Sequence, residues 1–398
     1  MTRRFRYAVV GGGGIGSATA YWLSRTAGED VLCLEQWELG HDRGASEDHS
    51  RIIRLGYHAA HYTALTRDSY AAWDVVERES GVQLVHRTGM VNLAQPGTEG
   101  STILDNYEAA MTAHDIRYER FDGREVMRRW PQFRLAGDHD AIFQADGGIL
   151  DIRKAVAVHF ALARANGATV RPDAEVTQID DSGPAIRLRT SAGDFEAERV
   201  VICAGAWTAR LLETQLGIRW PIRLTQEQVT YFSTAHPRRF TPERFPIWIW
   251  HGQEEYYGFP VYGEVATKAA QEICGESVGL DAQSWVPDRA RIDRVSDFVE
   301  SVLPGYSGPE LYTRCCLYDM PPDRDFVVDR LPGHPNIAIG IGAGHAAKFA
   351  GILGRILAEL STAGTTSYPI EAFRADRPAL VDPKFAPGYR LGAAVTSG

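Results

Sequence analysis

The first forty residues pass from an apolar run to an amphipathic stretch and back. Residues 7–10 are uniformly apolar, which predicts a short buried strand. After a cluster of glycines, apolar residues recur at helical spacing across residues 18–23 and predict one face of a helix. Residues 30–35, DVLCLE, predict a second strand that ends at Glu35. This order is typical of a compact β-α-β unit.

Three later segments continue the same kind of pattern. Residues 146–170 predict a turn, a helix and a strand, and residues 198–208 predict a buried strand that ends at glycine. Residues 336–360 predict a strand, a glycine turn and a long amphipathic helix. We expect these segments to belong with the β-α-β unit to one Rossmann-type α/β domain.

The stretches between these segments are rich in Trp, Tyr and Pro and favour an antiparallel sheet. The run PIWIWHGQEEYYGFPVYG, residues 246–263, has the alternation of strands. We therefore predict a discontinuous dinucleotide domain with a substrate domain inserted into it. The dinucleotide domain takes residues 1–85, 146–225 and 320–398, and the substrate domain takes residues 86–145 and 226–319.

The glycine cluster between the first strand and helix has the spacing G-x-G-x-x-G. Such glycines permit a tight turn, close approach of a pyrophosphate and close helix packing, and the helix N-terminus offers free N–H groups to the phosphates. Glu35 follows about 20 residues later, where a carboxylate binds the adenosine ribose. It disfavours NADP but does not separate NAD from FAD. The predicted contacts here are Gly11, Gly13, Gly14, Ile15, Gly16 and Glu35.

Composition and charge exclude several partners. The 398 residues carry a net charge of −9, with 44% hydrophobic and 23% charged residues, so neither nucleic acid nor an anionic membrane is indicated. No apolar run approaches the roughly 20 residues that span a bilayer. The apolar run after the basic N-terminus is too short for a signal peptide. An odd number of cysteines, five, fits a reducing cytoplasm.

Two of the five cysteines, Cys315 and Cys316, are adjacent. A disulfide between neighbours is strained, and the spaced pairs that bind zinc are absent, so no metal site is predicted. Burial as packing residues and attachment to a cofactor both stay open. In an extended segment neighbouring side chains point to opposite faces, so only one of the two can reach a cofactor.

Several motifs, in their order and spacing, resemble one family. They are VVGGGGIGSATAYWL, SRIIRLGY, DGGILD, VICAGAW, YYGFPVYG, CLYDMPPDRDFVVD and GAGHAAKF, spread over about residues 6–382. The chain resembles the flavin-dependent amine oxidases of the D-amino-acid oxidase superfamily, in particular the monomeric sarcosine oxidases and N-methyltryptophan oxidases. This implies a glutathione-reductase-like FAD domain interleaved with an α+β substrate domain on an antiparallel sheet. It also implies a monomer that oxidises secondary or primary amino acids to imines and reduces O₂ to H₂O₂.

The resemblance assigns roles to residues. Cys316 matches the cysteine that is tied to the flavin by a thioether, which leaves Cys315 as a packing residue. Arg54 and Lys348 match a substrate-carboxylate clamp, and Lys268 matches the lysine that activates O₂. Arg51 and His345 match residues beside the flavin and are expected to be catalytic, and Tyr257 and Tyr318 match the substrate pocket. Lys348 is also expected to contact the cofactor. The other predicted cofactor contacts are Gln36, Ser50, Val176, Gly205, Gly342 and Gly344. Surface cations, core aromatics and a structural histidine are the alternatives.

The sequence also departs from the sarcosine oxidases. Glu272 stands where they carry a pocket histidine, and Ala346 and Ala347 replace a glycine and an aromatic residue. We expect Glu272 to bind substrate, unless it points to solvent, and a bulkier or more cationic substrate than sarcosine. Competing functions are a dehydrogenase that passes electrons to a quinone or carrier, an NAD-dependent enzyme, a biosynthetic imine or amine oxidase, and a non-enzymatic flavoprotein.

Overall fold

The computed structural model describes residues 3–57 and 59–387. Its first sheet contains the predicted β-α-β strands, in the order β10-β11-β12-β1-β2-β9, with β20 beside β12 and β19 beside β20. The strands are β1 (Arg3–Val10), β2 (Val31–Leu34), β9 (Thr169–Arg171), β10 (Val176–Asp180), β11 (Ile186–Thr190), β12 (Gly193–Ile202), β19 (Val327–Arg330) and β20 (Ile337–Ile341).

The parallel part of this sheet brings four loops together. Strand β1 pairs in parallel with β2 and β12, and β12 pairs in parallel with β20. Since parallel strands end at a common edge, the residues that follow them open there. These are Gly11 after β1, Glu35 after β2, Gly205 after β12 and Gly342 after β20. The fold therefore gathers predicted cofactor contacts from four distant parts of the chain.

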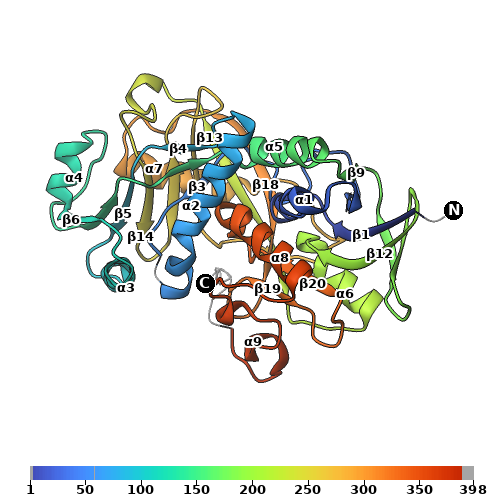
Figure 1. Cartoon of the computed structure of the whole chain (residues 1–398). Helices are drawn as coiled ribbons and strands as arrows, with labels where there is room; N and C mark the ends of the chain where they lie inside the picture. The colour runs from blue at the N-terminus through green and yellow to red at the C-terminus, as the bar shows by residue number, and fades with distance from the viewer. Residues whose placement is uncertain (1–2, 58, 388–398) are drawn as a thin grey trace.

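Helices cover both faces of the first sheet. Helices α1 (Gly14–Ala27), α5 (Ile152–Ala165) and α8 (Ala350–Ala363) pack through a shared apolar core on one face. The long helix α2 (Ala60–Ser80) packs beside α8 near the middle of the molecule (Figure 1). On the opposite face, α6 (Thr208–Leu216) and α9 (Pro378–Val381) contribute to a second core.

The second sheet lies beside the first and contains the predicted substrate segments (Figure 1). Its order is β17-β13-β16-β15-β14-β5-β7-β6, with β18 beside β13. Helices α3 (Gly100–Ala113), α4 (Gly123–Arg129) and α7 (Arg289–Val302) contact its strands. Its strands are β5 (Met90–Ala94), β6 (Glu119–Asp122), β7 (Asp140–Gln144), β13 (Arg223–Phe232), β14 (Ile247–His251), β15 (Tyr256–Phe259), β16 (Thr267–Gln271), β17 (Glu276–Ser277) and β18 (Glu310–Met320).

This sheet is antiparallel, as predicted, except where β5 meets β14. Those two strands pair in parallel, with Met90 beside Ile247. They come from the two separate inserted segments, so no short hairpin turn dictates their relative direction. A third, small sheet joins β3 (Arg51–Ile53), β8 (Gly148–Leu150) and β4 (Val85–Arg87).

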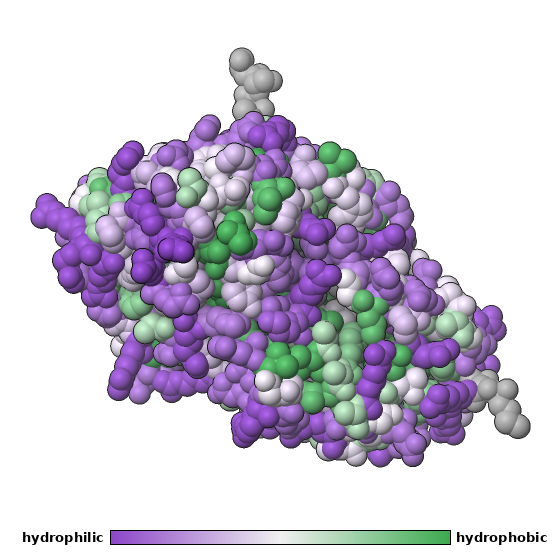
Figure 2. All heavy atoms as spheres, turned by 90° about the horizontal axis from the view of Figure 1, so that it is seen from above, coloured by the Kyte–Doolittle hydropathy of each residue, from purple (hydrophilic) through white to green (hydrophobic). Residues whose placement is uncertain are grey.

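The strands of the two large sheets lie close to the predicted bounds of the two domains. The division into these domains stays a prediction. Strand β13 begins at Arg223 and β18 ends at Met320, so each crosses a predicted boundary by only a few residues. The view in Figure 2 shows a mainly hydrophilic face on which hydrophobic residues form separate patches. Within residues 3–57 and 59–387, no helix is long and apolar enough to cross a membrane.

The contact between α1 and α8 depends on a glycine and is directly testable. A Cβ added at Gly354 would stand 2.5 Å from the Cβ of Ala18, whereas one added at Gly351 would meet its nearest neighbours at 3.4 Å. We expect Gly354→Ala to lower the free energy of unfolding by about 1–3 kcal/mol through overpacking. The matched change Gly351→Ala should be neutral or slightly stabilising. Urea unfolding followed by tryptophan fluorescence measures both, and equal losses of stability would contradict this packing.

Candidate active site

A cavity of about 990 Å³ is lined by residues of both sheets. This volume lies at the upper end of the range for small-molecule and cofactor sites. Among the predicted cofactor contacts, all except Gly16 line it. All the predicted catalytic and substrate-binding residues also line this cavity: Lys268, Arg51, His345, Arg54, Lys348, Tyr257, Tyr318 and Glu272. The structure thus brings them together, while their individual roles stay predictions.

The turn between β1 and α1 requires glycine at two positions, Gly11 and Gly16. Gly11 has a φ of +99°, and a Cβ there would lie 2.4 Å from the carbonyl oxygen of Cys203. A Cβ at Gly16 would lie 1.9 Å from the carbonyl oxygen of Gly11, which explains why Gly16 supports the turn without reaching the cavity. The turn therefore brings bare backbone to the N-terminus of α1 at the cavity wall.

The predicted ribose-binding carboxylate, Glu35 after β2, contacts this turn. The Glu35 carboxylate accepts hydrogen bonds from the backbone N–H groups of Gly12 at 2.7 Å and of Trp37 at 3.1 Å. Gly14 donates its N–H to the hydroxyl of Ser46 at 2.9 Å. A glycine cradle, a helix N-terminus and a buried carboxylate beyond the second strand fit an adenine dinucleotide.

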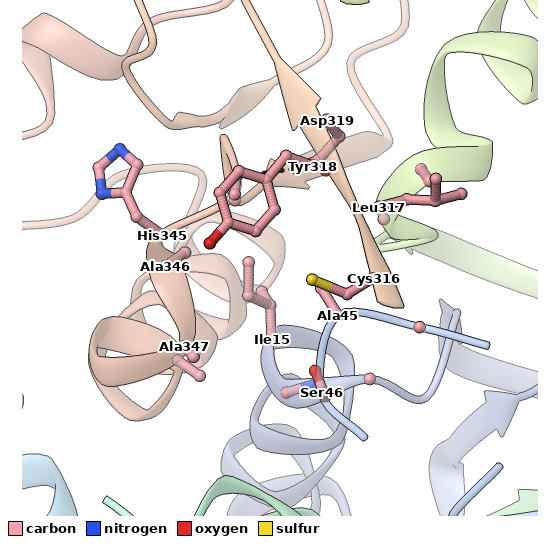
Figure 3. A pocket seen from close by; sticks show the side chains of 18 of the residues that line it. Ile15, Ala45, Ser46, Cys316, Leu317, Tyr318, Asp319, His345, Ala346 and Ala347 are labelled. Carbon is pink, nitrogen blue, oxygen red and sulfur yellow. Dashed lines mark hydrogen bonds between the residues drawn. The ribbon is translucent and has the colours of Figure 1, made fainter. Parts of the chain in front are cut away.

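Strand β18 places one cysteine of the adjacent pair in the cavity. Cys316 lines the cavity and Cys315 does not. The sulfur of Cys316 and the ring of Tyr318 lie on the side of the strand that faces Ile15, whereas Leu317 points the other way (Figure 3). Burial raises the pKa of the Cys316 thiol to about 12, although nearby Arg51 opposes the shift. The cysteine that lines the cavity is thus the one that the family resemblance selects.

Lys268 on β16 takes part in a buried ion pair with Asp48. Its ammonium donates to the Asp48 carboxylate, to the carbonyl of Ser50 at 2.9 Å and to the Ser50 hydroxyl at 3.0 Å. Both side chains are almost fully buried, at 3% and 4% exposure. Asp48 also accepts from the hydroxyl of Tyr231 at 2.5 Å and from Arg51 at 3.2 Å.

Each charge in this pair shifts the pKa of the other. Asp48 raises the pKa of Lys268, and Lys268 lowers the pKa of Asp48. Burial lowers the pKa of Lys268 to about 8, although Asp48 opposes the shift. Burial also raises the pKa of Asp48, but Lys268 and Arg51 outweigh it and hold that pKa well below its usual range. Asp48 was not predicted from the sequence. Its position two residues before the SRIIR motif, in an otherwise polar loop, was the signal available.

Arg54 and Lys348 share an aromatic wall. The Arg54 guanidinium lies 4.3 Å from the ring centre of Tyr57 and 5.4 Å from that of Tyr107, and the Lys348 ammonium lies 5.4 Å from the Tyr57 ring. The Nε atom of Arg54 is buried without a hydrogen-bond partner. Within the described chain neither cation has an ion-pair partner. Burial lowers the pKa of Lys348 well below its ordinary value, and Arg54 lowers it further.

Glu272 and His345 meet at the segment that follows β18. Glu272 lines the cavity and pairs with Arg324 at 3.4 Å, which disfavours the alternative that it points to solvent. The Nε2 atom of His345 lies 2.9 Å from the carbonyl oxygen of Arg324, so the imidazole holds this segment in place. A catalytic role of His345 stays a prediction. Arg324 was also not predicted as a site residue, although it lies within a motif, PPDRDF, that carries the family resemblance.

The glycine turn after β20 is fixed against β18. Gly344 has a φ of +77° and donates its N–H to the buried carboxylate of Asp319 at 3.1 Å. A Cβ at Gly344 would stand 2.4 Å from the ring of Tyr318. Burial raises the pKa of Asp319 to about 6. This contact, also missed from the sequence, sets the position of the loop that carries Lys348.

Comparison with known proteins agrees with this site. The FAD dependent oxidoreductase family matches residues 6–360, and the chain belongs to that family. It is 31% identical over 381 residues to a monomeric sarcosine oxidase of Streptomyces avermitilis, which covers 94% of this chain and 97% of that one. It is 28% identical over 390 residues to an N-methyl-L-tryptophan oxidase of Escherichia coli, covering 94% and 99%. The solved structure of NikD, an unusual amino acid oxidase essential for nikkomycin biosynthesis, is similar with a TM-score of 0.82, 28% identity and coverage of 94% and 98%.

The ion pair of Lys268 and Asp48 generates a test of stability. Asp48→Asn leaves a buried ammonium without its anion, and Lys268→Met leaves a buried carboxylate without its nearest cation. Each change should cost about 3–5 kcal/mol of unfolding free energy at neutral pH. The double variant should cost clearly less than the sum, because it removes both charges. Additive losses in urea unfolding would show that the two charges do not stabilise each other.

The cost of Asp48→Asn should depend on pH. Without Asp48 the folded-state pKa of Lys268 falls below about 8, while that of the unfolded chain stays near the ordinary value of about 10.4. Between these values the unfolded state binds more protons, so stability rises with pH. In wild type the same lysine loses its proton only near pH 8, so the deficit of the variant against wild type should shrink between pH 6 and about pH 8 and stay constant above it. A deficit that grows over this range would contradict the assignment.

Proposed function

We propose that this protein oxidises the α-C–N bond of a secondary or primary amino acid to an imine, with FAD as cofactor and O₂ as the acceptor reduced to H₂O₂. The observation that carries the proposal is the pair of cations, Arg54 and Lys348, on one wall of the cavity, neither of which has an ion-pair partner among the described residues. A substrate carboxylate fits them, because Arg offers a forked donor and Lys a point charge. The expected monomeric state and cytoplasmic location stay predictions.

The names of the related proteins support an amino acid as substrate. Two of the relatives are named for sarcosine and N-methyl-L-tryptophan, and the similar solved structure is named an amino acid oxidase. These substrates share a carboxylate next to the carbon that bears nitrogen and differ in their side chains. The carboxylate clamp is therefore the part of the site that we carry over to this chain.

The residues around the cavity fit FAD in two parts. The glycine turn and Glu35 would hold the adenosine and pyrophosphate. Ser50, Arg51 and Cys316 would lie at the flavin, and we propose a thioether between Cys316 and the flavin 8α-carbon. When bound, FAD supplies the electron acceptor for the hydride of the amino acid and passes the electrons to O₂.

The protein's own groups would prepare the amino acid for oxidation. The substrate nitrogen must lose its proton, so that its lone pair can stabilise the electron-poor carbon. Cations near an ammonium group lower its pKa. Arg54 and Lys348 would thus both hold the carboxylate and favour the neutral amine, while the tyrosine walls exclude water. Positioning of the carboxylate also fixes the α-C–H bond relative to the acceptor.

Lys268 would serve the reaction with O₂ by stabilising negative charge that develops there. One observation favours the alternative, a dehydrogenase that uses another electron acceptor. The ammonium of Lys268 is already paired with the Asp48 carboxylate, and a paired cation exerts a weaker net field. The buried surroundings, Arg51 and the donors to Asp48 partly offset that loss, which keeps the oxidase as the primary proposal.

The clamp predicts selective loss of substrate affinity. Charge-assisted hydrogen bonds contribute roughly 1.5–3 kcal/mol each, so Lys348→Met or Arg54→Met should weaken amino acid binding by about 10- to 150-fold. The exposed Lys384→Met is the matched control and should change nothing. A panel of N-methyl, cyclic and ordinary amino acids, read out as peroxide, measures this and identifies the substrate. An amino acid ester oxidised as fast as the acid would contradict the clamp.

The cysteine pair predicts where the flavin is attached. We expect acid-precipitated wild-type protein to retain its yellow colour, because a thioether survives unfolding. Cys316→Ala should release all the colour into the supernatant, whereas Cys315→Ala, the neighbour outside the cavity, should retain it. Mass spectrometry of the intact protein confirms the added mass. Complete release of flavin from wild-type protein would rule out covalent attachment.

A further inference from the structure

The segment after β18 holds one residue in a strained conformation. Arg324 has a φ of +61°, in the left-handed region that residues with a side chain rarely adopt. Its own N–H donates to the carbonyl of Pro321 at 2.9 Å, which closes a tight turn. Strain of this kind persists only where surrounding contacts fix the backbone, and it is common at ligand sites.

Contacts on both sides fix this turn. The carbonyl of Arg324 accepts from the hydroxyl of Tyr62 at 3.3 Å, in addition to its contact with His345. The Arg377 guanidinium binds the Asp323 carboxylate at 2.6 and 3.0 Å and donates to the carbonyl of Asp325 at 2.9 Å. The flanking residues of Arg324 are thus anchored to the body of the protein, and its side chain is left to project from a rigid turn.

The Arg324 side chain projects toward Glu272 in the cavity. Its Nη2 atom lies 3.4 Å from Glu272 Oε1, and its Nε atom is buried without a hydrogen-bond partner. Both residues act electrostatically on Lys348, since Glu272 raises its pKa and Arg324 lowers it. The pair and the carboxylate clamp line the same cavity. Among the described residues the Arg324 side chain donates only to Glu272, which leaves N–H groups of its terminal nitrogens available.

The charged residues that line the cavity decide which substrate side chains can enter it. Glu272 alone would attract a cationic side chain, as the sequence suggested. Arg324 already neutralises Glu272, so an incoming cation would meet the positive charges of Arg54, Lys348 and Arg324 beside a carboxylate that is already paired. Like charges that approach in a partly buried site repel strongly. A side chain with an acceptor oxygen meets the opposite situation, because Arg324 lines the cavity and its terminal nitrogens can donate to such an oxygen.

We propose that the Glu272–Arg324 pair is the side-chain-selecting element of the amino acid site. It accepts side chains that carry an acceptor oxygen, and it rejects cationic ones. This rests on the proposed function, because the clamp must hold the carboxylate for the side chain to reach the pair. It argues against the expectation of a more cationic substrate, which stays untested, and gives Arg324 a role that the sequence motif did not assign.

Three unreactive carboxylates of equal length test the proposal on the FAD-loaded protein. Pentanoate, glutarate and 5-aminopentanoate share the carboxylate and differ only in a neutral, anionic or cationic end. Isothermal titration calorimetry measures their affinity without turnover. For wild-type protein we expect glutarate to bind most tightly and 5-aminopentanoate to bind about tenfold more weakly than pentanoate, on the scale of one charge-assisted contact.

Two variants should shift this order in opposite directions. Glu272→Gln frees Arg324 and should raise the affinity for glutarate about tenfold over its effect on pentanoate. Arg324→Asn removes the guanidinium yet tolerates a positive φ, so it frees Glu272 with little added strain. It should raise the affinity for 5-aminopentanoate above that for pentanoate. Arg324→Lys keeps the charge and should keep the wild-type order, and the exposed Arg330→Asn should change nothing.

The outcomes separate this inference from the function on which it rests. If both variants change the affinity for all three acids by one common factor, the pair does not select the side chain, while the clamp stands. If wild-type protein binds none of the three acids, the carboxylate clamp fails and the selection falls with it. Opposite shifts of glutarate and 5-aminopentanoate support both.

Discussion

The buried ion pair between Lys268 and Asp48 is the constraint on which the cavity depends. Lys268 comes from the second sheet, Asp48 from the loop that leads into β3, and Tyr231, which donates to the same carboxylate, from β13. A buried charge without its partner costs several kcal/mol, so this contact strongly favours one relative placement of the two sheets. Ser50 and Arg51, predicted to lie at the flavin, are held by the same network.

The two buried lysines of the cavity differ in one respect that assigns their tasks. Both have a pKa lowered by burial. Lys268 keeps a permanent anion within the protein, whereas Lys348 has no ion-pair partner among the described residues. A lysine left without an anion beside Arg54 is arranged for an anion that comes from outside. The selecting pair, Glu272 and Arg324, is neutral as a unit and so leaves that preference intact.

Local patterns determined what could be predicted from the sequence. The β-α-β unit follows from glycine spacing and apolar periodicity, and the choice of Cys316 over Cys315 follows from strand alternation and the family resemblance. The partners of those residues could not be predicted, because they are far apart in sequence. Asp48 meets Lys268 across 220 residues, and Glu272 meets Arg324 across 52. The parallel pairing of β5 and β14 likewise depends on packing between separate inserts.

The central claim is a division of labour between two cations, with Lys348 serving the amino acid and Lys268 serving O₂. Stopped-flow absorbance tests it by measuring two rates, the anaerobic loss of flavin colour with the amino acid and the return of colour on mixing with O₂. Lys268→Met should slow the return by about 10²–10³-fold and leave the loss nearly unchanged. Lys348→Met should slow the anaerobic loss of colour and leave the return of colour nearly unchanged. Return of colour at the wild-type rate in Lys268→Met would contradict the account, and fast return only with a dye acceptor would favour the dehydrogenase.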